Sequence, residues 1–280
     1  VITGAALLNL ALDPVFIFGL FGFQRLEVQG AALATLVSNS IMLIFALANL
    51  HYRRRVYARL FASMRVLLDA WRHVLHHGIP AMITNAISPV SSAIGVALVA
   101  TFGVDAVAGF GVAMRIEPMF LIPFYALSAV SSPFFGQNFG SGRTGRLVEA
   151  RRVLARFCMG FGFLLALVLL VVSAPLAALF SESETIRTVA VQYLRIVALS
   201  YGAYGLVMSV NAAFNGMGKP LPGVVISTCR VIVVFLPLAL LGKYLAGLAG
   251  LFTATLVSNM LLGTVAYLWL GRQIRQSTSS

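Results

Sequence analysis

Two polar side chains four residues apart interrupt an apolar stretch near the start of the sequence. Asn9 and Asp13 lie among leucine, alanine, valine and phenylalanine, and Pro14 follows the acid directly. On a helix this spacing places both side chains on one face, and the proline leaves a carbonyl one turn earlier without its backbone donor. A carboxylate inside a membrane is costly and by default marks an ion or proton site. Asn9 and Asp13 are therefore candidates for binding Na⁺ or carrying a proton, and the alternative is an acid that caps or pairs locally at a membrane edge.

A second apolar stretch offers further oxygen atoms. Thr35 and Asn39 are also four residues apart, and the small residues before them allow close helix packing. Thr35 is expected to join Asn9 and Asp13. Hydroxyl groups bonded back to the backbone of a packed helix would explain the same pattern.

Glu117 is the one acid well inside the later apolar stretches. Arg115 is two residues away and therefore points to another side of a helix, which leaves Arg195 or Arg230 as a partner from a different helix. The pattern favours a structural ion pair at Glu117, with a substrate or gating contact as the alternative.

Polar and aromatic side chains also gather on one side of two other stretches. Such a face suits the wall of a cavity for flat apolar ligands, although the same residues also pack helices. With Glu117, the candidate lining residues are Asn85, Ser88, Tyr201, Tyr204 and Asn211, and Ser91 and Ser92 extend the face of Asn85.

The composition requires lipid as the main solvent of the elements that position these residues. Of the 280 residues, 60% are hydrophobic and 10% are charged, whereas a soluble domain is about half apolar and a quarter charged. The charges behind the net value of +12 cluster between apolar runs, which argues against nucleic acid as a partner. The apolar runs of membrane-spanning length, expected to be helices, are roughly 1–20, 29–50, 79–101, 105–136, 150–176, 189–214, 221–242 and 245–270.

Basic residues predict the orientation in the membrane. Arginines concentrate in residues 51–78 and 137–156 and at the C-terminus, and the positive-inside rule places these segments in the cytoplasm. Apolar residues at helical spacing within 51–78 predict an amphipathic helix on the inner leaflet, with a loose basic loop as the alternative. Residues 137–149 are expected to form a cytoplasmic loop. The fourth apolar stretch is expected to be tilted or kinked at Pro118, Pro123 and Pro133.

An internal repeat predicts the architecture. Gly30–Asn39 reads GAALATLVSN and Gly250–Asn259 reads GLFTATLVSN. The two copies are an even number of spans apart, so they point the same way, as in a parallel repeat of six-helix units. The predicted fold is an all-α polytopic membrane protein with two six-helix lobes and eight transmembrane helices in this chain. Its predicted parts are the last two helices of an incomplete first lobe, a cytoplasmic linker and a complete second lobe with a short tail, at 1–50, 51–78 and 79–280.

Enzyme signatures are missing from the sequence. It contains no phosphate-binding loop of the Walker type, no nucleophile elbow and no HExxH zinc motif. We therefore expect a protein that is not an enzyme, that needs no cofactor other than a coupling ion, and that draws its energy from an ion gradient.

Several motifs extend over nearly the whole chain: NLALDP at Asn9–Pro14, GAALAT at Gly30–Thr35, GQNFGSGR at Gly136–Arg143, YLRI at Tyr193–Ile196 and NAAFNGMGKP at Asn211–Pro220. In this order they resemble the multidrug and toxic compound extrusion (MATE) family of transporters. The resemblance implies a cation site in the first lobe, to which Asn9, Asp13 and Thr35 correspond. The acids that some branches carry in the second lobe are absent around Ser88 and Tyr204, which favours the branch of the DNA-damage-inducible type.

The resemblance further implies a bacterial inner-membrane antiporter that exports amphipathic drugs and other xenobiotics in exchange for H⁺ or Na⁺ by rocker-switch motion, and that is a monomer at full length. Its partners would be small molecules and membrane lipid. Arginines outnumber Glu117 within the spans, which argues against a strong preference for cationic drugs. The alternative function is a lipid-linked saccharide flippase of the same superfamily, which an arginine-lined cavity would favour and which would not need Asn9 and Asp13.

Overall fold

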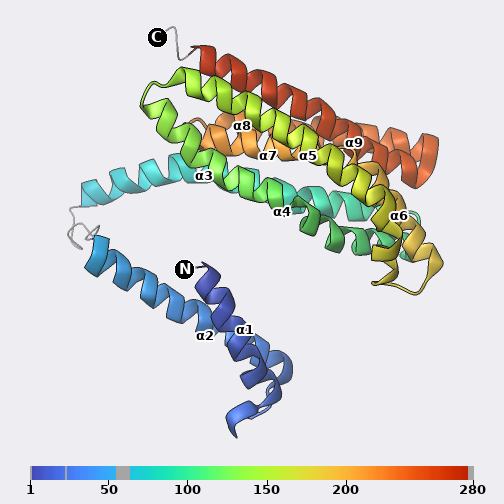
Figure 1. Ribbon diagram of the computed structural model, residues 1–280, viewed down its shortest axis with the longest axis horizontal. Coiled ribbons are helices and arrows are strands. Elements are labelled where there is room, and N and C mark those ends of the chain that lie inside the picture. Colours follow the sequence, from blue (N-terminus) through green and yellow to red (C-terminus); the bar gives the residue numbers. More distant parts are fainter. Residues whose placement is uncertain (1, 23, 55–63, 277–280) are drawn as a thin grey trace. The chain divides into compact units, whose positions relative to one another are not determined.

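The chain is helical throughout the part that the computed structural model describes, residues 2–22, 24–54 and 64–276, and no strand occurs there (Figure 1). It forms two compact units, Val1–Ala70 and Trp71–Ser280. The boundary between them falls within one long helix, α3 (Met64–Ala100).

The first unit is a pair of antiparallel helices. α1 (Ile2–Phe18) is followed by a short 3₁₀ turn, η1 (Leu20–Gly22), and by α2 (Glu27–Ala48), which continues into a π-helical stretch, η2 (Asn49–Arg54). The backbone N–H of Leu26 donates to the carbonyl of Phe16 at 3.1 Å, and Met42 near the end of α2 lies against Gly4 near the start of α1. Large apolar side chains such as Leu10 and Leu36 remain more than 60% exposed in this unit, as expected for helices whose solvent is lipid.

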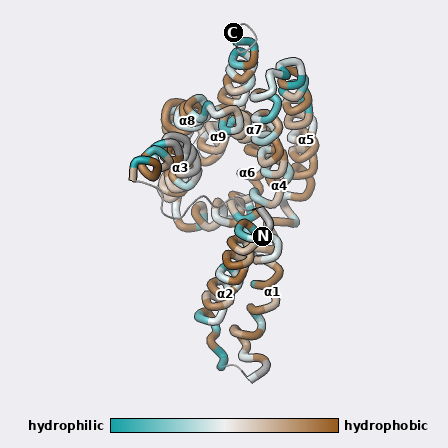
Figure 2. Tube along the Cα trace, turned by 90° about the vertical axis from the view of Figure 1, so that its left-hand side faces the viewer, coloured by the Kyte–Doolittle hydropathy of each residue, from teal (hydrophilic) through white to brown (hydrophobic). Residues whose placement is uncertain are grey.

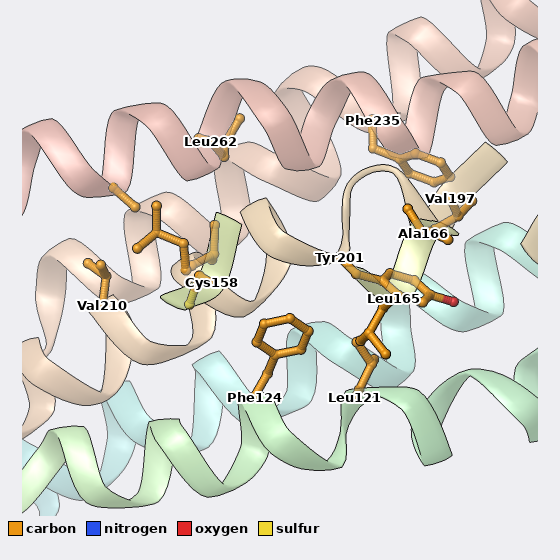
Figure 3. Close-up of a cluster of buried hydrophobic side chains, with 14 of the residues drawn as sticks. Leu121, Phe124, Cys158, Leu165, Ala166, Val197, Tyr201, Val210, Phe235 and Leu262 are labelled. Carbon is orange, nitrogen blue, oxygen red and sulfur yellow. The ribbon is translucent and has the colours of Figure 1, made fainter. Parts of the chain in front are cut away.

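The second unit is built around one short helix that other helices enclose. Its elements are α3, α4 (Val104–Gly140), α5 (Thr144–Ala178), α6 (Glu184–Ala198), α7 (Tyr201–Gly216), α8 (Leu221–Thr228), the π-helical η3 (Cys229–Phe235) and α9 (Leu236–Gln276). α7 packs against α4, α5, α8 and α9. Figure 3 shows Tyr201 and Val210 of α7 together with buried side chains of the neighbouring helices, among them Phe124, Cys158 and Leu262.

The outward faces of the second unit are as apolar as its core. On α5 the buried positions recur every three or four residues, as for one face of a helix, yet the opposite face carries Phe163 and Val171 at 66% and 76% exposure. Figure 2 shows hydrophobic residues along α5 and hydrophilic ones gathered near the C-terminal end of α9. A helix that is hydrophobic all round belongs in a membrane or a large core, and the unit therefore belongs in a bilayer.

The described residues include four helical runs that are long and apolar enough to cross a membrane: Glu27–Tyr52, Val104–Gly140, Thr144–Ala178 and Leu221–Gln276. The pair α6 and α7 is a fifth if the two helices count as one span. All-helical membrane architecture is thus confirmed, while the number of eight spans stays a prediction.

The stretch 189–214 is not the continuous helix that its apolar pattern predicts. α6 ends at Ala198, α7 begins at Tyr201, and the two helices are bent by 60°. Ser200 lies at the break, where its N–H donates to the carbonyl of Val197. The two halves differ in polarity, since α6 carries Glu184, Arg187 and Arg195 whereas α7 has no charged residue, but this difference does not itself predict a bend.

Two predicted polar segments also differ from the structure. The predicted loop 137–149 is much shorter in the structure, because α4 continues to Gly140 and α5 begins at Thr144, which leaves residues 141–143 as the connection. The amide of Asn138 donates to the carbonyl of Phe134 at 2.8 Å, so a residue type common in loops is satisfied inside the helix. In the predicted linker 51–78, residues 55–63 lie outside the described residues, and α3 then runs from Met64 to Ala100 without a break at residue 78. α4 is likewise continuous through its three prolines.

A single turn divides α9 in two. Ala246 and Gly247 leave helical geometry, and Gly247 has φ 60° and ψ −135°. This conformation is essentially restricted to glycine, so the chain reverses at this residue. The turn lies close to the boundary predicted between the stretches 221–242 and 245–270.

The contact between α5 and α7 depends on the absence of two side chains. A Cβ added at Gly162 would meet the Cα and N of Gly202, and one added at Gly202 would meet the carbonyl of Cys158. Such small residues let membrane helices approach closely.

We expect Gly162→Val to lower the free energy of unfolding by about 3 kcal/mol, because backbone atoms cannot yield as a flexible side chain would. Thermal unfolding of the full-length protein in detergent measures this loss. Gly160→Val on the same helix is the control, since a Cβ there enters open space, and its effect should stay within about 0.5 kcal/mol. Equal losses for the two variants would contradict the packing argument.

Candidate ion and substrate sites

The candidate ion site in the first unit joins three side chains from two helices. The amide nitrogen of Asn9 donates to Oδ1 of Asp13 and to Oγ1 of Thr35, each at 3.3 Å. The hydroxyl of Thr35 donates in turn to the carbonyl of Ala31 at 3.0 Å. The helical spacing of Asn9 and Asp13 thus gives the shared face that the sequence predicts, and the antiparallel pairing of α1 and α2 brings Thr35 to it.

This cluster presents a carboxylate that accepts one hydrogen bond, from the amide of Asn9. Asp13 is half-buried, and one of its oxygens accepts from Asn9 while acceptor capacity remains on the other. A proton can reside on the carboxyl group itself. Na⁺ prefers oxygen ligands, as hard cations do, and would take the carboxylate together with the amide oxygen of Asn9 once the amide group is turned round. Asn39 is exposed and lies outside this cluster of hydrogen bonds.

The second unit encloses a cavity of about 240 Å³. Its wall comes from α3, α4, α6, α7, η3 and α9. The wall thus includes one residue from each side of the α6–α7 bend and two from the π-helical η3, and π-helical turns are frequent at functional sites.

One side of the cavity carries a chain of hydrogen bonds. Arg230 of η3 donates through Nη1 to Oδ1 of Asn259 at 3.1 Å. Asn259 donates to Oγ of Ser200 at 3.0 Å, and Ser200 donates to the carbonyl of Val197 at 2.8 Å. The guanidinium carbon of Arg230 also lies 5.1 Å from the centre of the Tyr204 ring, a favourable arrangement for a cation and an aromatic face. The Arg230 guanidinium is thus held in one orientation.

Glu117 on α4 is held by a tyrosine instead of an arginine. The hydroxyl of Tyr193 donates to Oε2 of Glu117 at 2.9 Å. The Tyr201 hydroxyl, close to the same carboxylate, is buried and makes no hydrogen bond of good geometry within the described residues. The predicted ion pair is therefore wrong: Arg230 lends only its nearby charge, and Arg195 donates to Ser173 at 3.1 Å. A tyrosine on a neighbouring helix leaves no pattern within the sequence around Glu117.

Aromatic rings form another part of the wall. The centres of Phe110 and Tyr193 are 5.2 Å apart and those of Tyr193 and Phe252 are 5.1 Å apart, both in edge-to-face geometry. Phe110 and Phe252 are nearly parallel, at 12° and 6.2 Å. These contacts lie within the range in which ring pairs stabilise one another, so the three rings support one another in the wall.

The predicted lining residues fall into three groups. Glu117 and Tyr204 line the cavity, as do Ser91 and Ser92. Tyr201 belongs to the buried core behind the wall, and Asn211 donates to Ser227 at 2.8 Å away from the cavity. The side chains of Asn85 and Ser88 lie outside the described residues, although their backbone belongs to α3. A role in substrate binding stays a prediction for all six predicted residues.

The residues that sequence reasoning did not assign to the cavity include Arg230, Asn259 and Thr255. The repeat held the signal for two of them, since Thr255 and Asn259 correspond to Thr35 and Asn39. Of the three intramembrane arginines, only Arg230 lines the cavity, because Arg115 is exposed and Arg195 is bonded to Ser173. No group of three or more metal-binding side chains occurs within residues 2–22, 24–54 and 64–276.

Membrane-length helices around a cavity lined by polar and aromatic side chains define a polytopic helical membrane protein with the features of a transporter. The family model described as MatE matches residues 80–241, more than half of the chain. The chain therefore belongs to the MatE family. The relatives and structural neighbours described below are named as transporters or multidrug resistance proteins and not as enzymes.

Individual relatives agree with this assignment. The chain is 36% identical over 267 residues to the "FAD transporter" of Shewanella oneidensis, covering 95% of this chain and 59% of that protein. It is 27% identical to the "Probable multidrug resistance protein YoeA" of Bacillus subtilis, with 96% and 60% covered. The crystal structure of the Vibrio cholerae MATE transporter VcmN in its bent form superimposes with a TM-score of 0.87 at 29% identity, with 98% and 61% covered. The chain thus spans about three fifths of the length of these relatives.

Proposed function

We propose that the full-length protein is a secondary antiporter that exports amphipathic organic compounds across the bacterial inner membrane in exchange for H⁺ or Na⁺. The observation that carries the proposal is the Asn9 amide, which joins Asp13 and Thr35 across α1 and α2. A carboxylate held by hydrogen bonds within a membrane helix suits a cation that must bind on one side and leave on the other.

In this mechanism Asp13 takes up the coupling cation from the outside and releases it to the inside. The cation and the cargo would bind to different conformational states. Each would therefore shift the protein between its outward-open and inward-open states in a rocker-switch cycle. Asn9 and Thr35 orient the carboxylate. Whether the cation is H⁺ or Na⁺ decides if Asn9 acts only as a donor or also as an oxygen ligand.

The name of one similar relative suggests FAD as the cargo. The relative named an FAD transporter is 36% identical to the chain over 267 residues, whereas relatives named as multidrug resistance proteins are 27% and 24% identical over similar lengths and 35% identical over 162 residues. We therefore propose flavin nucleotides as the cargo class, within the broader class of amphipathic organic compounds.

The flippase alternative receives little support. It would be favoured by an arginine-lined cavity, and the cavity in the second unit contains Arg230 as its one arginine among the described residues. The cluster around Asp13 would also have no role in a flippase.

The proposed architecture is the one that the repeat predicts: the last two helices of a first lobe in 1–50, a cytoplasmic linker in 51–78 and a six-helix second lobe in 79–280. We propose eight spans in this chain, the arginine-rich segments and the C-terminus in the cytoplasm, and a monomer at full length.

Export from liposomes tests the proposal. The full-length protein is reconstituted with FAD enclosed, and a pH or Na⁺ gradient is imposed in the absence of the other. We expect one of the two gradients to accelerate FAD release well above that of liposomes without protein, and collapse of that gradient by an ionophore to remove the difference. Release that neither gradient changes would contradict antiport, and transport of a labelled lipid-linked saccharide instead of FAD would favour the flippase.

A further inference from the structure

We infer that the cavity of the second unit holds the isoalloxazine ring system of the flavin, an inference that rests on the proposed export of FAD. The cavity offers a space for one ring system, aromatic surfaces against which a ring can stack, and a guanidinium with a carboxylate at its polar edge.

The size of the cavity selects part of the cargo. Sites that enclose a whole drug-sized ligand have volumes of roughly 300–1,000 Å³, and this cavity has about 240 Å³. A complete dinucleotide does not fit, whereas one fused ring system does. The remainder of the cargo must then lie outside this cavity.

The aromatic surfaces suit a flat and electron-poor ring. Tyr204 and Tyr125 line the cavity together with Phe110 and Phe252, and rings stacked on such side chains gain binding energy beyond the area that they bury. Tyr193 and Phe252 support each other edge to face, so the wall is formed before a ligand enters. A preformed wall lowers the ordering cost of binding.

The polar edge suits the pyrimidine side of isoalloxazine, which presents a carbonyl, an N–H and a second carbonyl in a row. Arg230 uses Nη1 on Asn259, while its Nε is buried and has no partner within the described residues. Its remaining N–H groups can therefore donate to a carbonyl oxygen. Glu117 is held by Tyr193 at one oxygen and, since a carboxylate can accept about four hydrogen bonds, it can accept the ring N–H.

The other parts of FAD match this edge less well. Adenine has no carbonyl oxygen for a guanidinium. A pyrophosphate group would match Arg230 but would lie in the same small cavity as the carboxylate of Glu117, where like charges repel. The paired donor and acceptor thus select a neutral heteroaromatic imide over a phosphate.

Quenching of riboflavin fluorescence tests the inference, because stacking on tyrosine quenches isoalloxazine and riboflavin lacks both phosphates and adenine. Riboflavin is titrated with the full-length protein in detergent, and adenosine is added as a competitor. We expect quenching that adenosine does not reverse, a dissociation constant raised about tenfold or more by Arg230→Met, and one raised about threefold to tenfold by Tyr204→Leu. Matched controls are Arg195→Met, whose guanidinium bonds to Ser173 outside the cavity wall, and Tyr244→Leu, whose side chain is 88% exposed.

The outcomes separate the cavity from the export function. Absence of quenching, equal affinities for cavity and control variants, or competition by adenosine would each overturn the assignment of the ring to this cavity. FAD export that persists in Arg230→Met and Tyr204→Leu would also overturn it while leaving the export proposal intact. Cavity-dependent riboflavin binding by a protein that exports no FAD would overturn export and retain the binding site.

Discussion

Asp13→Asn is expected to reduce gradient-driven export to the level of liposomes without protein, while the protein remains folded and inserted. The substitution keeps the size of the side chain and an oxygen that can accept from the Asn9 amide. The side chain can no longer carry a proton or the negative charge that binds Na⁺. Without an exchange of charge at this site, the gradient has no differential effect on the two states of the protein. Release of FAD under an imposed gradient, with the protein amount matched by immunoblot, measures the loss.

Two other acids provide the comparison. Asp105→Asn changes an exposed acid at the start of α4, whose carboxylate accepts from Thr185 at 3.2 Å, and it should leave export near the wild-type rate. If Asp13→Asn exports normally and Glu117→Gln does not, coupling belongs to the second unit and our assignment of the ion site is wrong.

Asn259→Leu is expected to lower the free energy of unfolding by about 2–3 kcal/mol. The side chain holds Arg230 with its oxygen and Ser200 with its nitrogen, and hydrogen bonds to charged groups contribute about 1.5–3 kcal/mol. Arg230 is half-buried, so partial access to water keeps the loss below that of a fully enclosed charge. Thermal or denaturant unfolding of the purified full-length protein gives the value.

The repeat supplies the control for this prediction. Asn39 occupies the matching position in the first copy but is exposed, so Asn39→Leu should change the free energy of unfolding by less than about 0.5 kcal/mol. Arg230→Met combined with Asn259→Leu should recover at least about 1 kcal/mol relative to Asn259→Leu alone, because an apolar pair leaves no unsatisfied charge. Similar losses for Asn39→Leu and Asn259→Leu would mean that the residue matters for helix packing and not for Arg230.

Sequence periodicity was sufficient for most of the helices and for the shared face of Asn9 and Asp13, since both depend on local spacing. The face shared by Asn9 and Asp13 follows from a separation of four residues, and the pairing of α1 with α2 adds Thr35. The predicted spans are helical over most of their described residues, because apolar length and the absence of water favour helices, but the span 189–214 is broken between α6 and α7.

The second site depends on contacts between distant segments, which spacing cannot predict. Ser200 lies at the bend between α6 and α7 and accepts from Asn259 of α9, which is 59 residues away in the sequence. The partner of Glu117 is a tyrosine 76 residues away. The sequence prediction considered only arginines as partners for the carboxylate and was therefore wrong. The helical residues 137–140 that were predicted as loop have a local cause instead, because Asn138 finds its acceptor inside α4.

The length of α5 can be compared with the thickness of the bilayer that surrounds it. The helix has 35 residues and is therefore about 50 Å long, whereas the hydrocarbon layer is about 30 Å thick. Its arginines end at Arg156, and the remainder to Ala178 covers about 33 Å, close to that thickness. The first turns of α5 must then project into the headgroup region and the water beyond it, with their arginines against anionic lipid. A thinner bilayer would expose the apolar rim of the helix or increase its tilt, so the rate of transport should depend on the acyl-chain length of the membrane that surrounds it.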